Sequence, residues 1–276
     1  MALRGVDISE HNGSVDFAAL KNAGVAFVIL RLGYGSDYTN QDDKRFAENV
    51  RKAEAAGLPW GAYLYSYART TAMAKSEAQH ALRLLGDKKP LYGVWFDVEE
   101  TQIAQTDLTA TCRTFCDTLE AVGLYTGIYA SLSWLTTKLS SAQLDRYDKW
   151  VAQWNSSCTY GKAYGIWQYT DKLVIGGKNF DGNYAYKDYP SIVQGINQPE
   201  EEEEEETMLT YDQWKAYMER YQEEQANKAV SDWAQEAVDF VKAQGYMSGD
   251  TDGKFRPQSP ITRQEVAAVL QNALGE

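Results

Sequence analysis

Residues 91–99 read Leu-Tyr-Gly-Val-Trp-Phe-Asp-Val-Glu, an apolar segment that ends in two acids. An apolar run of this length predicts a buried strand, which is typical of a sheet that helices cover. Side chains two positions apart on a strand share a face, so we expect Asp97 and Glu99 to point together, with Cα atoms about 6–7 Å apart. The alternative is an ordinary solvated strand end.

Similar apolar runs recur before and after this strand, and amphipathic segments separate them. Residues 42–56, for example, place Phe46, Val50 and Ala53 on one side of a helix. Strands that alternate with helices imply parallel βαβ units, and about eight strands in about 190 residues predict an α/β fold. We expect an irregular (β/α) TIM-like barrel whose later helices are shortened or lost. The expected strands lie at residues 3–8, 25–32, 60–67, 91–99, 124–130, 150–154, 166–169 and near Phe180.

The chain divides into three parts by composition. Residues 1–194 carry the strand–helix pattern and form the barrel. Residues 195–206 contain the acidic run 200–206, whose like charges predict an extended or weakly helical linker. Residues 207–276 hold three amphipathic segments, and capping-box signatures at Thr210/Gln213 and Thr262/Glu265 predict a small all-α domain.

Charge and composition exclude several classes of function. The net charge is −12, and −5 without the acidic run, so we expect no basic surface and no nucleic-acid partner. The chain has 2 His, which argues against a Cys/His zinc site, and we expect neither a metal nor a cofactor. No apolar run is long enough to cross a membrane, so no membrane partner is expected.

The cysteines and the first residues bear on where the protein is made. An odd set of cysteines, Cys112, Cys116 and Cys158, fits thiols that are kept reduced in a cytoplasm. Residues 1–5 do not have the charged and then apolar pattern of a secretory signal peptide. We therefore expect synthesis in the cytoplasm without a signal peptide.

Two further acids are expected at the same end of the barrel as Asp97 and Glu99. Asp7 ends the first strand, and Asp181 lies near the last. The first and last strands of a closed barrel are neighbours, so the four carboxyl groups should converge where barrel enzymes place their chemistry. Burial and mutual repulsion should raise the pKa of one of them, as a general acid requires. Four carboxylates without metal-binding histidines favour glycoside hydrolysis over metal-assisted hydrolysis.

Four short motifs occur in order along the barrel: residues 6–13 (VDISEHNG), 97–99 (DVE), 167–169 (WQY) and 180–181 (FD). Together they resemble glycoside hydrolase family 25, lysozymes common among bacteriophage endolysins and bacterial autolysins. The similarity covers residues 3 to about 185 and implies hydrolysis of the β-1,4 bond from N-acetylmuramic acid to N-acetylglucosamine in bacterial peptidoglycan.

The same resemblance implies a role for each acid. Glu99 is the general acid and then the base. Asp97 orients or stabilises the acetamido group or the oxocarbenium-like state. Asp7 and Asp181 complete an acidic floor. A covalent intermediate and a route through the substrate's own acetamide both remain open.

The resemblance also points to sugar contacts around these acids. Many relatives have His where this chain has Leu64, which leaves Tyr63 and Tyr65 as substrate contacts on one face of their strand. The other expected contacts lie at or near strand ends, and each could instead be a loop or core residue: His11, Tyr34, Tyr129, Trp154 and Gln168.

The C-terminal domain resembles a second family. Residues 231–234 (SDWA), 245–249 (GYMSG), 252–257 (DGKFRP) and 261–265 (ITRQE) are similar to an S-layer homology motif, a module that holds proteins to secondary polymers of Gram-positive walls. The resemblance implicates Trp233 and Arg263 in wall binding. The family usually has three copies and this chain has one clear copy. We therefore expect residues 207–276 either to bind the wall or to form a homo-oligomer.

Three functions stay open at this point. The first is an endolysin-type muramidase that acts on the bacterial cell wall after release from the producing cell, with a housekeeping cytosolic enzyme as the variant. The second is a glycosidase on the same barrel that acts on another amino-sugar polymer, which the fold alone does not exclude. The third is a non-catalytic wall-binding protein, which the intact Asp97-Val98-Glu99 motif disfavours.

Overall fold

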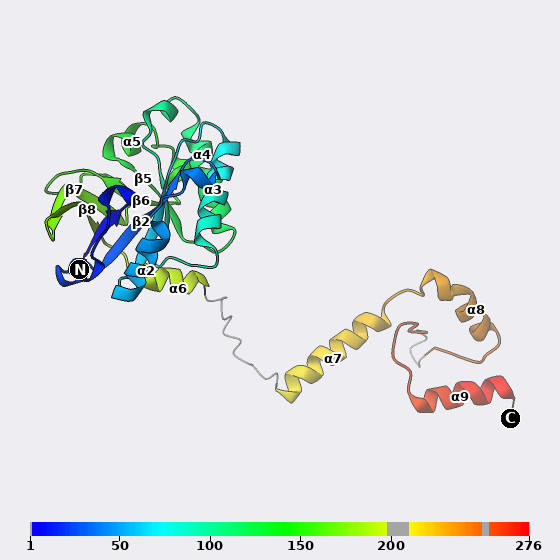
Figure 1. The fold of residues 1–276 in the computed structure, drawn as a ribbon. Coiled ribbons are helices and arrows are strands. Elements are labelled where there is room, and N and C mark those ends of the chain that lie inside the picture. Colours follow the sequence, from blue (N-terminus) through cyan, green and yellow to red (C-terminus); the bar gives the residue numbers. More distant parts are fainter. Residues whose placement is uncertain (1, 198–209, 250–253, 276) are drawn as a thin grey trace. The chain divides into compact units, whose positions relative to one another are not determined.

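The computed structural model describes residues 2–197, 210–249 and 254–275 of the chain. The chain forms two compact units, residues 1–201 and 202–276 (Figure 1). Most of the expected acidic linker lies outside the described residues. Its first three residues belong to helix α6 (Tyr189–Asn197). The barrel unit therefore continues slightly past the boundary that we expected at residue 194.

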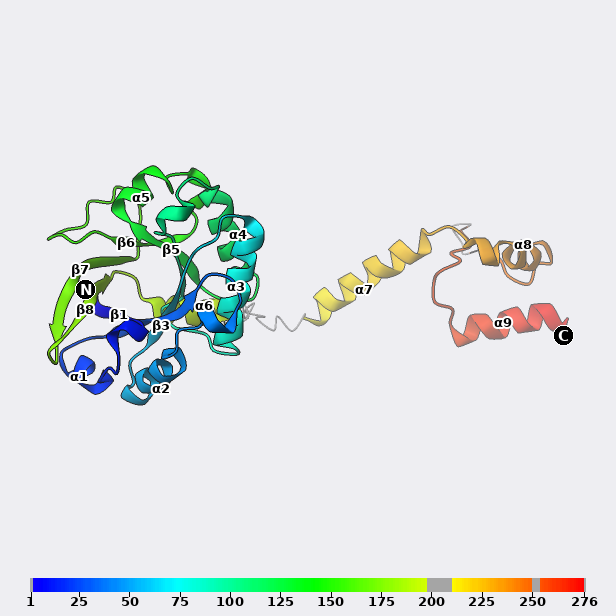
Figure 2. The ribbon, with the colours of Figure 1, turned by 45° about the horizontal axis from the view of Figure 1, so that its top comes forward.

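The first unit is a closed barrel in which eight strands follow one another in chain order. Figure 2 shows the ring of strands with helices on its outside. The expected α/β barrel is thus confirmed, and its strand bounds are Leu3–Ile8 (β1), Phe27–Tyr34 (β2), Trp60–Tyr65 (β3), Val94–Asp97 (β4), Thr126–Ser131 (β5), Asp148–Ala152 (β6), Ile166–Ile175 (β7) and Lys178–Ala185 (β8).

The last strand departs from the parallel arrangement that we expected. Strands β1 to β7 pair in parallel, whereas β8 is antiparallel to both β7 and β1. The reason is the connection, because β7 and β8 are separated only by Gly176 and Gly177, both at positive φ. Two such residues make a hairpin turn, while a parallel connection needs a crossover of a dozen residues or more.

Helices cover the outside of the earlier strands and become short toward the end of the barrel. Helix α5 has 6 residues, and the described segment between β6 and β7 contains no helix, as expected for an irregular barrel. The helices of this unit are α1 (Phe17–Asn22), α2 (Phe46–Ala56), α3 (Thr71–Leu85), α4 (Leu108–Glu120), α5 (Leu132–Thr137) and α6, with 3-10 turns η1 (Glu10–Asn12), η2 (Thr39–Gln41), η3 (Thr101–Ile103) and η4 (Ala142–Leu144).

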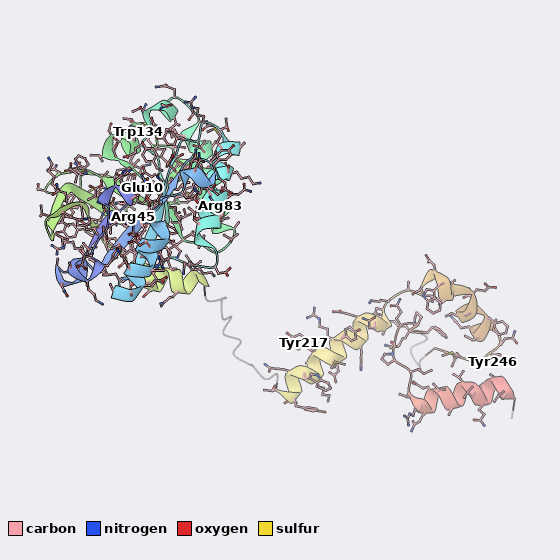
Figure 3. The ribbon with its side chains drawn as sticks, in the orientation of Figure 1. Glu10, Arg45, Arg83, Trp134, Tyr217 and Tyr246 are labelled. Atoms are coloured by element: carbon pink, nitrogen blue, oxygen red, sulfur yellow. The ribbon has the colours of Figure 1, made fainter. Side chains whose placement is uncertain are left out.

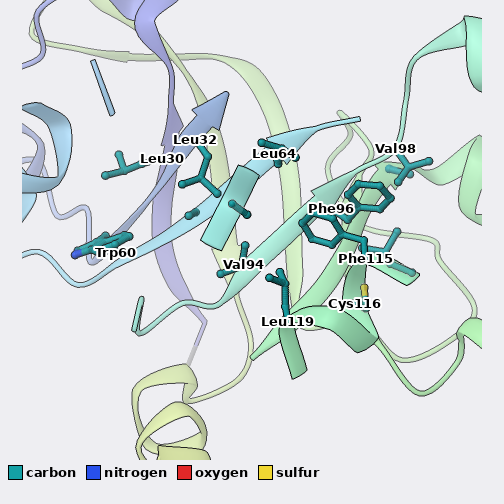
Figure 4. Close-up of a cluster of buried hydrophobic side chains, with 14 of the residues drawn as sticks. Leu30, Leu32, Trp60, Leu64, Val94, Phe96, Val98, Phe115, Cys116 and Leu119 are labelled. Carbon is teal, nitrogen blue, oxygen red and sulfur yellow. The ribbon is translucent and has the colours of Figure 1, made fainter. Parts of the chain in front are cut away.

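Strand β4 packs on both faces, and the two faces differ in character. Val94 and Phe96 belong to the core between the strands and the helices, and Phe96 stacks on Phe115 of α4 at a centroid distance of 4.1 Å (Figure 4). Trp95 belongs to a separate cluster with aromatic residues of other strands. Because side chains alternate along a strand, Asp97 shares the face of Trp95 and points into the barrel.

Aromatic side chains fill the barrel beneath the acids. Trp95 and Trp150 are both fully buried and meet edge to face at 6.0 Å, and Phe27 stacks on Tyr92 at 4.3 Å. Gly5 makes room for this layer, since a Cβ there would lie 2.3 Å from the ring of Phe27. This packed layer is a rigid floor for the polar residues that follow on the same strands.

The second unit is helical in its described residues, as expected. It contains α7 (Tyr211–Ala226), the 3-10 turn η5 (Asp232–Ala234), α8 (Gln235–Ala243) and α9 (Arg263–Leu274). Capping boxes at Thr210 and Thr262 begin α7 and α9. Ala226 alone is buried among the described residues of this unit, and Tyr217 stands out from α7 in Figure 3. Across the described ranges, each helix is too short or too polar to cross a bilayer.

Candidate active site

A cavity of about 390 Å³ opens over the aromatic floor and collects the four expected acids. Asp7 comes from β1, Asp97 from β4 and Asp181 from β8, while Glu99 lies two residues beyond the end of β4. The cavity is lined by Asp7, Ser9, His11, Asn12, Arg31, Tyr63, Tyr65, Asp97, Glu99, Tyr129, Trp150, Gln168 and Asp181.

Asp7 is the most strongly held of the four acids. Its Oδ2 accepts hydrogen bonds from Gln168 Nε2 at 3.0 Å and Asn183 Nδ2 at 2.8 Å. Burial, and then the charge of Asp181, raise the pKa of Asp7 well above its usual range. The pKa of Asp181 is also raised, mainly by burial. The two residues face each other in the pairing of β1 and β8, and two neighbouring buried carboxyl groups hold one proton more readily than either acid alone.

Asp97 carries an oxygen that lacks a partner. The residue is 3 % exposed, and its Oδ1 is buried without a hydrogen bond from any described residue. Burial, followed by the charges of Glu99 and Asp7, raises the pKa of Asp97 well above its usual range. A buried acceptor without a partner is costly, so this oxygen is placed to accept a hydrogen bond from a bound molecule.

Glu99 differs from the other acids because it is less enclosed. Strand β4 ends at Asp97, so Glu99 is not held by the sheet as the sequence led us to expect, and its side chain is half-buried at the cavity. Burial and then the charge of Asp181 raise the pKa of Glu99, while the neighbouring hydroxyl group of Tyr129 acts in the opposite direction. A reachable carboxyl group with a raised pKa suits proton transfer to a ligand.

The comparisons with known proteins agree with this geometry. The model of "Glycosyl hydrolases family 25" matches residues 6–178, which is more than half of the chain. The chain belongs to this family. The model of the "S-layer homology domain" matches residues 228–267, in the second unit.

Curated relatives and a solved structure support the family assignment. The chain is 30% identical over 177 residues to the "Autolytic lysozyme" of Clostridium acetobutylicum, covering 63% of this chain and 52% of that protein, so it spans about half the length of this relative. It is 27% identical to the "N,O-diacetylmuramidase" of a Chalaropsis species, covering 64% and 92% respectively. The catalytic domain of endolysin ply40 from the Listeria monocytogenes bacteriophage P40 has 25% identity and a TM-score of 0.60, covering 71% and 98%.

Most of the expected sugar contacts of this family 25 chain reach the cavity. His11, Tyr63, Tyr65, Tyr129 and Gln168 all line it. Tyr63 and Tyr129 lie over the floor beside Trp150, with centroid distances of 6.0 and 4.5 Å to its ring.

The side-chain amide of Gln168 makes three hydrogen bonds to residues in and beside the cavity. Besides its bond to Asp7, its Oε1 accepts from Tyr129 Oη at 3.1 Å and from Trp154 Nε1 at 3.1 Å. These three bonds occupy most of what one amide offers, so Gln168 orients its neighbours.

Two expected contacts lie outside the cavity lining. Tyr34 packs edge to face on Tyr67, with a centroid distance of 6.0 Å. Trp154 is 61 % exposed and reaches the site only through its bond to Gln168. Both residues are near strand ends, as the sequence indicated, but the end of a strand does not determine which way a side chain turns.

Four residues of the lining were not predicted from the sequence: Ser9, Asn12, Arg31 and Trp150. Arg31 is the charged one among them. Its guanidinium donates to Asp43 Oδ2 at 2.8 Å and to Glu10 Oε1 at 3.0 Å, and NH1 lies 3.1 Å from His11 Nε2. Glu10 is labelled in Figure 3. The sequence did carry a signal, because Arg31 is the charged residue within the otherwise apolar run 27–32 of β2. Its charge partly offsets the rise in the pKa of Asp97.

Proposed function

We propose that this family 25 chain is a lysozyme of the N-acetylmuramidase type. It hydrolyses the β-1,4 bond from N-acetylmuramic acid to N-acetylglucosamine in bacterial peptidoglycan. The observation that carries the proposal is the pairing of a reachable acid, Glu99, with a buried unpartnered oxygen on Asp97 in one cavity. These two groups meet different needs of glycoside hydrolysis.

Glu99 is the proton donor in this proposal. Its protonated carboxyl group gives the proton to the glycosidic oxygen as the bond from that oxygen to C1 breaks. The carboxylate that remains then takes a proton from the water molecule that attacks C1. The raised pKa of Glu99 keeps more of it protonated in the resting enzyme.

Asp97 acts on the sugar whose bond is cleaved. Its unpartnered Oδ1 accepts a hydrogen bond from the acetamido N–H, which directs the acetamido oxygen toward C1 and stabilises positive charge there. Asp7 and Asp181 form the acidic floor below, and Gln168 and Asn183 fix the orientation of Asp7.

We further propose a division of labour along the chain. Residues 1–194 are the catalytic part, 195–206 are a linker, and 207–276 bind secondary polymers of the wall through Trp233 and Arg263. The S-layer homology match and the 88 % exposure of Trp233 support this placement. The enzyme acts on the wall after release from the producing cell, in the manner of a phage endolysin.

The test combines lysis with product analysis. The full chain is added to a panel of purified Gram-positive walls, turbidity is followed, and the soluble products are reduced with borohydride and identified by mass spectrometry. We expect clearing and reduced N-acetylmuramic acid ends. Reduced N-acetylglucosamine ends would identify the other glycosidic bond, and cleavage of chitin in place of walls would identify another amino-sugar polymer.

A further inference from the structure

A buried carboxyl group outside the cavity plays no part in the proposed chemistry. Glu77 of α3 is 0 % exposed. Its Oε2 accepts from Ser66 Oγ at 2.7 Å and its Oε1 accepts from the backbone N–H of Tyr67 at 2.9 Å. Ser66 Oγ in turn accepts from the N–H of Ala68 at 3.1 Å. One carboxyl group thus fastens three consecutive residues of the loop that leaves β3.

This arrangement is costly for the fold. Burial raises the pKa of Glu77 to about 7, and none of the ion pairs found in the described ranges involves it. The titratable group that faces it from the neighbouring helix is Cys112 of α4. A buried acid without a cation costs free energy of folding, and an apolar side chain would fill the same space at a lower cost. The cost suggests that Glu77 has a role beyond stability, through the residues of the loop that it fastens.

The fastened loop follows Tyr65, the last residue of β3, and carries Tyr67, so that aromatic rings continue outward from the cavity. Tyr65, which lines the cavity, and Tyr67, which is 36 % exposed, have ring centroids 5.3 Å apart. Tyr67 in turn meets Tyr34 at 6.0 Å. We call these three residues the tyrosine wall. Aromatic rings with partly exposed faces are common linings of ligand sites, and these lie within the contact range of aromatic pairs.

The same helix also fastens the loop beyond Tyr34. His80 Nδ1 lies 3.0 Å from the carbonyl oxygen of Gly35, and the N–H of Asp37 donates to Ser76 Oγ at 3.1 Å. Helix α3 therefore fixes the loops that follow β2 and β3, which begin directly after Tyr34 and Tyr65.

The wall is also tied to the catalytic strand. The N–H of Ser66 donates to the carbonyl oxygen of Asp97 at 2.9 Å. The segment that Glu77 fastens is thereby hydrogen-bonded to the backbone of the strand that carries Asp97, at the edge of the cavity.

We propose that Glu77 is a positioning residue, which holds the tyrosine wall so that it receives a sugar ring next to those bound over the acids. This inference rests on the proposed function, since it takes a glycan as the substrate. It assigns Glu77 to binding, so its loss should raise KM and leave the chemical step nearly unchanged.

The experiment compares Glu77→Gln and Ser66→Ala with a matched control, Asp148→Asn, all in the full chain. Asp148 is also a buried acid, accepting from Tyr125 Oη at 2.8 Å and Tyr189 Oη at 2.6 Å, and unlike Glu77 it has an ion-pair partner, Lys187 Nζ at 2.9 Å. It begins β6, at the end of the barrel away from the cavity. The measurements are kcat and KM on soluble peptidoglycan glycan strands, Tm, and calorimetric Kd for the same strands in chains that also carry Glu99→Gln.

We expect Glu77→Gln and Ser66→Ala to raise KM and Kd about fivefold or more, with kcat within about twofold of the parent. Asp148→Asn should lower Tm and leave KM unchanged. Unchanged KM and Kd in folded Glu77→Gln and Ser66→Ala overturn the inference, and so does an equal rise in Asp148→Asn. If Glu77→Gln does not fold, Ser66→Ala decides, because it removes a hydroxyl group and retains the acid.

Failure of this inference is distinguishable from failure of the proposed function. Hydrolysis with unchanged KM overturns the positioning role alone. If the strands are not hydrolysed, Kd for the strands and for an N-acetylglucosamine hexamer still tests Glu77, and a rise in Kd supports it. Absence of any glycan binding overturns both proposals.

Discussion

Asp7 and Asp181 lie directly opposite each other across the antiparallel pair of β1 and β8. This relationship depends on the hairpin that reverses β8. Both carboxyl groups are buried, and the charge of Asp181 adds to the cost of charging Asp7, so the pair retains a proton to higher pH than a free acid. The four acids of the cavity therefore keep their protons to higher pH than four separate, exposed carboxyl groups would.

Glu99→Gln should abolish wall lysis without loss of the fold. The amide keeps the size of the side chain but has no proton to transfer, so we expect turnover to fall on the order of 100-fold or more. Turbidity clearing measures the loss, and circular dichroism checks the fold. Glu54→Gln, at an exposed position of α2, is the matched control and should clear walls normally. Near-normal turnover of Glu99→Gln would remove Glu99 from the site.

Asp97→Asn should reduce kcat strongly for a different reason. The change replaces a charge that stabilises the cleaved sugar, and it also exchanges one acceptor oxygen for an N–H group. We expect a loss in kcat of about 100-fold, comparable to the removal of one preorganised electrostatic contact. Steady-state kinetics on soluble glycan strands measure it. A variant with unchanged kcat and a raised KM would assign Asp97 to binding alone.

The pH dependence of activity should report Glu99. A general acid must be protonated, so activity falls as pH rises through its pKa, and the raised pKa of Glu99 moves this limb to higher pH. The charge of Asp181 is one cause of the rise, after burial. Asp181→Asn should therefore move the alkaline limb of kcat/KM to lower pH, by about one unit or less. If the alkaline limb stays at the same pH in Asp181→Asn, or moves to higher pH, Glu99 is not the general acid that it reports.

Much of this site could be predicted because its acids lie at the carboxyl ends of barrel strands, where active sites form. Acids at the carboxyl ends of barrel strands converge, and Asp7 and Asp97 needed only correct strand assignments to be found. The barrel was predictable for the same reason, since the strand–helix alternation is local. The reversal of β8 was missed because parallel pairing was expected throughout the barrel, although Gly176 and Gly177 were visible in the sequence.

Partners that are distant in the sequence were not predictable. Arg31 is held by hydrogen bonds to Glu10 and Asp43, and Glu77 is held by a hydrogen bond from Ser66. Each of these contacts forms only when several strands have closed and loops have turned. A single sequence shows the polar residue within an apolar pattern but does not name the atom that will satisfy it.

The stability of the barrel should depend on pH through Glu77. Its pKa in the folded chain is about 7, against an ordinary value of 4.5, so the folded state binds the proton more tightly. The stability that this gives is fully present below pH 4.5 and is lost as pH rises to about 7 and above. We expect a contribution on the order of 3 kcal/mol from the shift. Urea unfolding measures the free energy of unfolding between pH 4 and 8. This free energy should fall less with rising pH in Glu77→Gln than in the parent chain. An equal fall in both chains would contradict the role given to Glu77.

The C-terminal unit should bind walls by assembling copies of itself. Its apolar stripes remain exposed, with Trp214 at 50 %, Phe240 at 57 % and Leu270 at 54 %, and about 70 residues with so little buried surface gain little stability alone. We expect light scattering to give a mass of at least twice 31.0 kDa for the full chain and a monomer for a chain that ends at Asn197.

Wall binding would then gain from avidity, because several weak copies bind the same polymer network. An acidic chain is not drawn to an anionic wall by its net charge, so contact must come from local groups such as Trp233 and Arg263. Trp233→Ala and Arg263→Ala should each weaken wall pull-down while leaving cleavage of soluble strands unchanged. Trp214→Ala, on the stripe of α7, should reduce the measured mass and the pull-down together. If the full chain is monomeric, and the shortened chain binds and lyses walls as well as the full chain, the unit neither assembles nor anchors the enzyme.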